Sequence, residues 1–170
     1  MKKIVIAAVA ILVIIVGITA YMNRGDLAAK QDSQDNAILI IKSDGAEVAR
    51  VDMEYIKTLG EVEFDANIKS SGQDPEKHSF AGVPLKNVFD SQNIPTEGKT
   101  MVIVKAVDGY TSALNMDEVL EDDNVYLAYK RDGEPLGRKE DGGSGPYQVI
   151  IRKDPFSQRW CKFVMEIELQ

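Results

Sequence analysis

The chain has 170 residues, enough for one globular domain with a substantial core once an N-terminal segment is set aside. Its single cysteine excludes an internal disulfide and any zinc site built from several cysteines. The formal net charge is −7, and basic residues near the N-terminus leave the remainder more acidic still. Because an acidic surface repels phosphate backbones, the composition argues against nucleic acid as a partner.

The N-terminal segment has the pattern of a membrane anchor. Lys2 and Lys3 precede an uncharged, strongly apolar run over residues 4–22. As a helix this run would extend roughly 28 Å, close to the thickness of a hydrocarbon core. Lysines before such a run stay in the cytoplasm, so we expect residues 1–22 to be a single-pass anchor in the cell membrane, with the rest of the chain extracytoplasmic. The alternative is a signal peptide cleaved at about residues 18–20, which would leave the domain secreted.

The sequence after the predicted anchor divides into a polar segment and a folded domain. Residues 23–36 are polar and charged without an apolar period, which is typical of a flexible stalk. Residues 37–170 carry the periodic patterns of a folded domain. An apolar run over 37–42, an Asp-Gly turn at 44–45 and a second run over 47–51 predict a β-hairpin at its start.

The next predicted elements are a helix, a strand, a loop and a second helix. Asp52 has the side chain of a helix cap, and Gly60 is a typical helix stop. Residues 61–68 alternate strictly between apolar and polar side chains, which predicts a half-buried strand. Residues 69–79 are polar and are predicted to form a loop. Pro84 then opens a helix whose apolar residues recur at helical spacing.

The C-terminal half is predicted to be rich in strands with one short helix. Residues 115–120 have the spacing of a capping box. Residues 137–146, here called the glycine-rich loop, hold four glycines. Because short helices are inserted between strands, a mixed α+β layer architecture fits better than a doubly wound parallel sheet. The strands are expected over residues 100–106, 110–114, 125–131, 147–152 and 160–169.

Five short motifs follow one another along the folded part. They are FAGVPL at 80–85, VDGY at 107–110, LAY with GEPL within 127–136, GSGPYQVII at 143–151, and RW with a closing IEL within 159–169. In this order and spacing they resemble the oxidoreductase molybdopterin-binding domain, the sulfite oxidase family, in its minimal pterin-binding members. The resemblance covers roughly residues 37–170. It implies an α+β fold with a mixed, partly barrel-like sheet and short inserted helices, and molybdopterin or another pterin as the cofactor.

The chain departs from the catalytic members at one chemically decisive position. Those members ligate molybdenum through a cysteine thiolate a short distance before the GVPL element, and the corresponding residues 67–72 contain no cysteine. Ser70 and Ser71 cannot replace a soft thiolate donor. Cys161, the only cysteine, is expected to be a small core side chain, with a redox or metal role as the alternative. We therefore predict neither a metal ligand nor a catalytic residue.

Candidate cofactor contacts come from isolated basic, aromatic and glycine residues. His78, the only histidine, lies in a predicted loop beside carboxylates, and a solvated histidine is the alternative. The glycine-rich loop combines backbone freedom with positive charge and would suit a pterin phosphate, although it matches no phosphate-binding motif. An aromatic such as Tyr110 would stack on a ring or else belong to the core. The residues predicted to bind the cofactor are His78, Tyr110, Arg138, Lys139, Gly143 and Arg159.

Three functions stay open at this point. The first, which we favour, is a binding module that holds a pterin-like ligand, or docks on a membrane-associated redox protein, without its own metal-ligating cysteine. The second is a small oxidoreductase that depends on molybdenum cofactor. The third is an interaction domain that binds no small molecule. The fold follows from the resemblance more firmly than any of these functions does.

Overall fold

The computed structural model describes residues 2, 6, 9–21, 36–69, 72 and 74–170. Residues 9–21 form a helix with exposed side chains. Among the described residues, no helix combines the length and the hydropathy needed to cross a membrane. The predicted anchor over 1–22 lies partly outside the described residues, and the predicted stalk over 23–36 lies outside them except for Asn36.

One five-stranded sheet brings the start and the end of the folded part together. Its strands lie in the order β2-β1-β10-β5-β6. β1 pairs in parallel with β10, whereas the other pairs in this sheet are antiparallel. Buried and more exposed side chains alternate along β1, β5 and β6, which is the pattern of a sheet with one face on the core. The strands are β1 (Leu39–Ser43), β2 (Ala46–Val51), β5 (Met101–Ala106), β6 (Thr111–Asn115) and β10 (Val164–Leu169).

A second five-stranded sheet follows the order β3-β4-β7-β8, with β9 paired to β7. All of its pairs are antiparallel. Gly82 is required where β4 pairs with β7, because a Cβ atom there would lie 2.3 Å from the carbonyl oxygen of Leu127. This close approach accounts for the glycine of the FAGVPL motif. The strands are β3 (Val62–Ile68), β4 (Glu76–Pro84), β7 (Val125–Arg131), β8 (Glu134–Pro135) and β9 (Gln148–Ile151).

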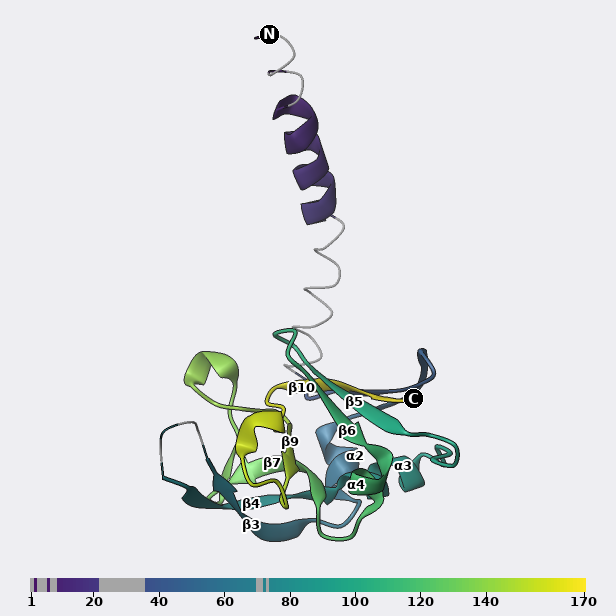
Figure 1. The fold of residues 1–170 in the computed structure, drawn as a ribbon, viewed down its shortest axis with the longest axis vertical. Coiled ribbons are helices and arrows are strands. Elements are labelled where there is room, and N and C mark those ends of the chain that lie inside the picture. The colour runs from purple at the N-terminus through teal and green to yellow at the C-terminus, as the bar shows by residue number, and fades with distance from the viewer. Residues whose placement is uncertain (1, 3–5, 7–8, 22–35, 70–71, 73) are drawn as a thin grey trace.

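Short helices complete a mixed α+β fold in which the sheets curl into a half-barrel. Figure 1 shows the two sheets as facing layers, with α2, α3 and α4 gathered at one side. The predicted cap is present, since Asp52 Oδ1 accepts a hydrogen bond from the Tyr55 amide at 2.8 Å. One apolar core lies between the layers. The helices are α2 (Met53–Lys57), α3 (Leu85–Ser91) and α4 (Met116–Leu120), and the 3₁₀ turns are η1 (Lys139–Asp141) and η2 (Ser157–Arg159).

Two predicted boundaries are wrong. Residues 76–79 were expected in a loop but open β4, where they pair with the polar end of β3 and stay exposed or half-buried. Their polarity reflects that solvent-facing position. The last strand begins at Val164, later than the predicted residue 160, because Phe163 adopts a φ of 55°, which no extended strand can contain.

Candidate functional site

A cleft lies where η2 and the residues after it meet the ends of β3 and β9. It consists of two adjoining hollows of about 310 and 280 Å³ that share Gln158, Trp160 and Lys162 in their walls. We call it the Trp160 cleft. Ligand sites are concave in this way and combine apolar walls with a few convergent polar groups. The remaining lining residues are Ile68, Lys69, Gln148 and Ser157 in the first hollow, and Asp108, Tyr110 and Phe163 in the second.

Trp160 is held rigidly in the wall between the two hollows. Its side chain is 6% exposed, and its indole Nε1 donates a hydrogen bond to the Ile151 carbonyl oxygen at 3.1 Å. The ring meets Phe80 edge to face, with centroids 5.9 Å apart. A buried indole normally finds a partner for its N–H, and this one does so within the protein. The ring surface is therefore fixed in the cleft wall without help from a ligand.

Gln148 gives the first hollow an unusual polar wall. The residue is 2% exposed, yet its Oε1 atom has no hydrogen-bond partner. Leaving a buried acceptor unpaired costs about 1–3 kcal/mol, so such an atom needs a physical explanation. Oε1 itself is closed to solvent, but Gln148 lines the hollow, so a small shift of its side chain would let a ligand that enters there supply the missing donor. A carboxamide also offers two donors beside its acceptor, which suits the edge of a heterocycle.

Two lysines make the cleft attractive to an anion. Lys162 lines both hollows and has no ion-pair partner in the described part of the chain. Lys69 lines the first hollow, and its Nζ lies 4.6 Å from the centre of the Phe156 ring. Asp108, in the second hollow, accepts a hydrogen bond from the Tyr110 amide, and this bond, together with Lys139, lowers the pKa of its carboxyl group. The first hollow is thus the more positive of the two.

The donors around the cleft fit the organic part of a molybdopterin and do not fit a thiolate-held metal. Gln148, Trp160 and Lys162 offer an amide edge, a ring surface and a positive charge. Cys161 is fully buried, and burial raises the pKa of its thiol to about 12, so it stays protonated, whereas metals bind thiolates. Nor do the described residues contain a cluster of three or more His, Cys, Asp or Glu side chains able to hold a metal ion.

Of the six residues predicted to bind a cofactor, Tyr110 is the one that lines this cleft. Its ring is 44% exposed, and its hydroxyl donates to the Gln158 carbonyl oxygen at 2.7 Å. His78 lies on β4 instead, with Nδ1 2.7 Å from Asp132 Oδ2 and Nε2 3.6 Å from Glu76 Oε1. The structure therefore places His78 in a carboxylate cluster of its own, outside the cleft walls.

The glycine-rich loop uses its own amides rather than offering them to an anion. The amide of Gly143 donates to the Arg138 carbonyl oxygen at 2.8 Å, and that of Gly145 donates to Gly137 at 2.8 Å. Gly143 packs so closely on Gly137 that a Cβ atom would lie 2.3 Å from its backbone. Lys139 forms an ion pair with Asp108 at 3.2 Å. Arg138, Lys139 and Gly143 do not line the Trp160 cleft, although Lys139 borders its second hollow through Asp108 and through the Phe163 ring, whose centre lies 5.2 Å from its Nζ.

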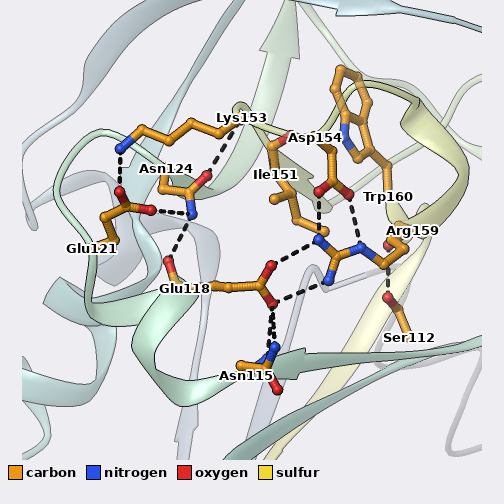
Figure 2. Close-up of polar contacts among 10 residues, drawn as sticks. All are labelled: Ser112, Asn115, Glu118, Glu121, Asn124, Ile151, Lys153, Asp154, Arg159 and Trp160. Atoms are coloured by element: carbon orange, nitrogen blue, oxygen red, sulfur yellow. Dashed lines mark hydrogen bonds and ion pairs between the residues drawn. The ribbon is translucent and has the colours of Figure 1, made fainter.

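Arg159 is the hub of a polar network with Glu118 and Asp154, as Figure 2 shows, and none of these three residues lines the cleft. Its guanidinium binds both carboxylate oxygens of Glu118, at 2.8 and 3.1 Å, and both oxygens of Asp154, with Nε at 2.9 Å from Oδ2. These contacts raise the pKa of Arg159 further. Because the guanidinium binds these two carboxylates and Arg159 does not line the cleft, it does not reach a ligand there directly.

The sequence reasoning missed Gln148 and Lys69 and did not connect Lys162 with them. The signal for Gln148 was present, because it is the only uncharged polar residue between Tyr147 and Arg152 in a strand that is otherwise apolar. A polar side chain that points to the core of such a strand either pairs with the protein or faces a ligand. The pairing itself depends on the tertiary structure, and a sequence does not display it.

Comparisons with known proteins identify the fold family. Comparison with curated proteins gives no match. The crystal structure of the sulfane dehydrogenase SoxCD from Paracoccus pantotrophus is similar, with a TM-score of 0.63 and 19% identity, over 81% of this chain and 38% of that chain. At this identity the likeness shows the fold alone, and the chain spans well under half the length of that relative. A family model described as the oxidoreductase molybdopterin binding domain matches residues 39–170. Since that match runs through both sheets and the three short helices between them, the chain belongs to the oxidoreductase molybdopterin binding domain family.

Proposed function

We propose that this domain is a membrane-anchored, extracytoplasmic binding module that holds a pterin-like anionic ring compound in the Trp160 cleft. It does so without the metal-ligating cysteine of catalytic family members. Membership of a molybdopterin-binding family supports the class of ligand. The shape and charge of the cleft support the place where the ligand binds.

The unpaired Oε1 atom of Gln148 is the observation that carries the proposal. A glutamine side chain that is 98% buried is retained at a cost to stability unless something in the cavity donates a hydrogen bond to it. A pterin ring carries amino and ring N–H groups along one edge and can satisfy it. The Trp160 ring beside it offers a surface for stacking.

The positive charge of the cleft agrees with an anionic ligand. Lys69 and Lys162 stand out in a chain whose net charge is −7. A pterin that carries a carboxylate or phosphate group gains from their attraction, whereas a neutral pterin does not. The ligand is therefore expected to combine a ring with a negative charge.

The proposal of a module without metal-based catalysis is supported by the donor set. No cysteine occurs in residues 67–72, and Cys161 is buried as a protonated thiol outside the cleft lining. The chain thus keeps a family scaffold and lacks the soft donor that molybdenum requires.

The direct test is a titration of the full-length chain, in detergent micelles, with pterin-6-carboxylate, a fluorescent anionic pterin. Trp160 is the only tryptophan, so its emission reports on this cleft alone. We expect a saturable change in the wild type and none in Gln148→Met. Ser144→Ala is the matched control, because Ser144 Oγ is also buried and unpaired but does not line the cleft. A wild type without saturable change contradicts the proposal.

A second experiment separates the binding module from the two other functions. The full-length chain is purified from a host that makes molybdenum cofactor, and molybdenum is measured by mass spectrometry beside pterin released by oxidation. Pterin without stoichiometric molybdenum supports the binding module. Stoichiometric molybdenum favours the oxidoreductase, and neither compound in a folded protein favours an interaction domain.

The membrane anchor needs its own test. The support for it is the pair Lys2 and Lys3 before the apolar run of residues 4–22. We expect the full-length chain in the membrane fraction, with its domain cut by protease added outside spheroplasts. A shortened soluble chain that begins near residue 21 shows a cleaved signal peptide instead, and protection from the protease contradicts the orientation.

A further inference from the structure

The segment that lines the Trp160 cleft is a short turn held by contacts on every residue. We call residues 157–160 the cleft turn. The Lys69 amide donates to Ser157 Oγ at 3.1 Å, and that hydroxyl donates back to the Lys69 carbonyl oxygen at 3.0 Å. The Gln158 carbonyl oxygen accepts from the Tyr110 hydroxyl at 2.7 Å. A turn of three 3₁₀ residues has little rigidity of its own, so such contacts determine its shape.

Arg159 supplies the strongest of these contacts. Its carbonyl oxygen accepts from Ser112 Oγ at 2.7 Å, while its side chain binds Glu118 and Asp154 with two contacts each. A planar guanidinium that engages two carboxylates in forks fixes direction as well as distance. Figure 2 shows Arg159 between these two acidic side chains, next to Trp160 in the chain.

The partners of Arg159 are themselves fixed. Glu118 Oε2 accepts a hydrogen bond from the Asn115 backbone amide at 3.0 Å, which belongs to the capping box of α4, and another from the Asn115 side-chain amide at 3.3 Å. The hydrogen bond from Arg159 is the main reason why the pKa of Glu118 is lowered. A second set of contacts runs on from Asn124, whose Nδ2 donates to the Glu118 carbonyl oxygen at 3.0 Å. The guanidinium is thus tied to a rigid corner of the domain.

Successive residues of the cleft turn have different surroundings. Gln158 and Trp160 line the cleft, and Arg159 between them binds acidic side chains that do not line it. We propose that Arg159 is a positioning residue of the Trp160 cleft, which holds Gln158 and Trp160 in place for an anionic ring ligand by anchoring the turn to Glu118 and Asp154. The part that concerns the ligand rests on the proposed function.

This role differs from general support of the fold. The indole Nε1 bond to Ile151 and the contact with Phe80 hold the far part of the Trp160 ring without Arg159. The backbone next to Trp160 is held by the ion pairs of Arg159 in addition to the hydrogen bonds of Ser157 and Gln158, and a shift of this backbone moves the near part of the ring. A lysine at position 159 keeps the charge but cannot make two forked contacts, so it should shift the turn while the core stays folded.

The first arm of the test needs no ligand. Trp160 emission and its quenching by acrylamide are measured in the full-length wild type, Arg159→Lys and Arg159→Gln. The matched control is Arg50→Gln, which removes a two-contact pair with Glu47 on β2. We expect a red-shifted, more accessible Trp160 in both Arg159 variants and no change in the control, with far-ultraviolet circular dichroism unchanged in Arg159→Lys. An unaltered Trp160 in folded Arg159 variants overturns the proposal.

The second arm measures pterin-6-carboxylate binding by the same proteins. We expect Arg159→Lys to bind about tenfold more weakly, the ratio that loss of one good contact produces. Glu118→Gln should weaken binding as well, and the double variant should be no weaker than Arg159→Lys alone, because both changes release the same anchor. Unchanged affinity in Arg159→Lys overturns the role toward the ligand. A wild type that does not bind pterin, with Trp160 shifted in the variants, refutes the proposed function and leaves the anchoring of the turn supported.

Discussion

The glycine-rich loop and the start of β9 lie close together in the sequence. Each contains a buried side-chain oxygen without a hydrogen-bond partner, but the surroundings of the two atoms differ. Ser144 and Gln148 are both 2% exposed, and each has a side-chain oxygen without a partner. Ser144 lies in a loop whose amides bond to the loop's own carbonyls, whereas Gln148 faces a hollow. An unpaired buried atom therefore indicates a ligand only where its residue lines a cavity. In the same way, glycines indicate a flexible backbone only where their amides have no hydrogen-bond acceptor in the protein.

The largest expected effect concerns the loop. Gly143→Ala should lower the free energy of unfolding by about 3 kcal/mol, because the new methyl group meets the Gly137 backbone, which cannot move aside like a side chain. Urea denaturation measures it. Gly142→Ala is the control, since space is open there and the cost of its φ of 76° is only about 1–2 kcal/mol. Equal losses in the two variants contradict a tightly packed loop.

The next largest effect compares how the two unpaired oxygens, Gln148 Oε1 and Ser144 Oγ, lower the stability of the fold. Gln148→Met should raise the free energy of unfolding by about 1–2 kcal/mol, because it removes an unsatisfied buried acceptor at similar volume. Ser144→Ala should also stabilise, by a smaller amount. Thermal unfolding of the ligand-free proteins measures both. A less stable Gln148→Met would mean that the carboxamide already has a partner within the protein.

A smaller effect tests the charge of the cleft. Lys162→Ala and Lys69→Ala should each weaken pterin-6-carboxylate binding by about 0.5–1 kcal/mol, the range for an exposed charge. The difference from the wild type should shrink as salt is added. Lys77→Ala is the control, because Lys77 pairs with Asp65 at 2.7 Å and does not line the cleft. A loss of the same size in the control would show that only net charge matters.

The smallest effect is a pH dependence at α4. Arg159 lowers the pKa of Glu118, so this carboxylate contributes stability that is present above its ordinary pKa of about 4.3 and is lost as the pH falls through the lowered value. Glu118→Gln should be less stable at pH 7 but should lose less stability below pH of about 4.3. Urea denaturation across that range measures the two slopes, and parallel slopes refute the assignment.

Much of the fold could be predicted from local patterns. The alternation of residues 61–68 and the cap at Asp52 are properties of neighbouring residues, and both elements are present in the structure. The start of β4 at Glu76 was missed because its exposed side chains are polar, and pairing with β3 decides its conformation. The positive φ of Phe163 likewise comes from tertiary contacts, with its amide donating to the Ser144 carbonyl oxygen at 2.9 Å.

The site was harder to predict than the fold because residue type does not reveal its partners. Arg159 was predicted from its charge, but Glu118, 41 positions away, and Asp154, 5 positions away, take up that charge. Gly143 was chosen for its freedom, and close packing removes it. Gln148 was not predicted, because the residue type alone does not show that its side chain is buried, unpaired and next to a hollow. The family motifs predicted the fold, whereas the cleft and the unpaired oxygen of Gln148 are visible only in the structure.

The parallel pairing of β1 with β10 has a consequence for the order of folding. β10, the last strand in the chain, lies between β1 and β5, and Gln170 exchanges backbone hydrogen bonds with Met101 at its end. Until β10 has been synthesised, that sheet exists only as two separate hairpins with open edges. Most of the domain therefore leaves the ribosome exit tunnel before its central strand is available, and this sheet closes only after the last residues have been made.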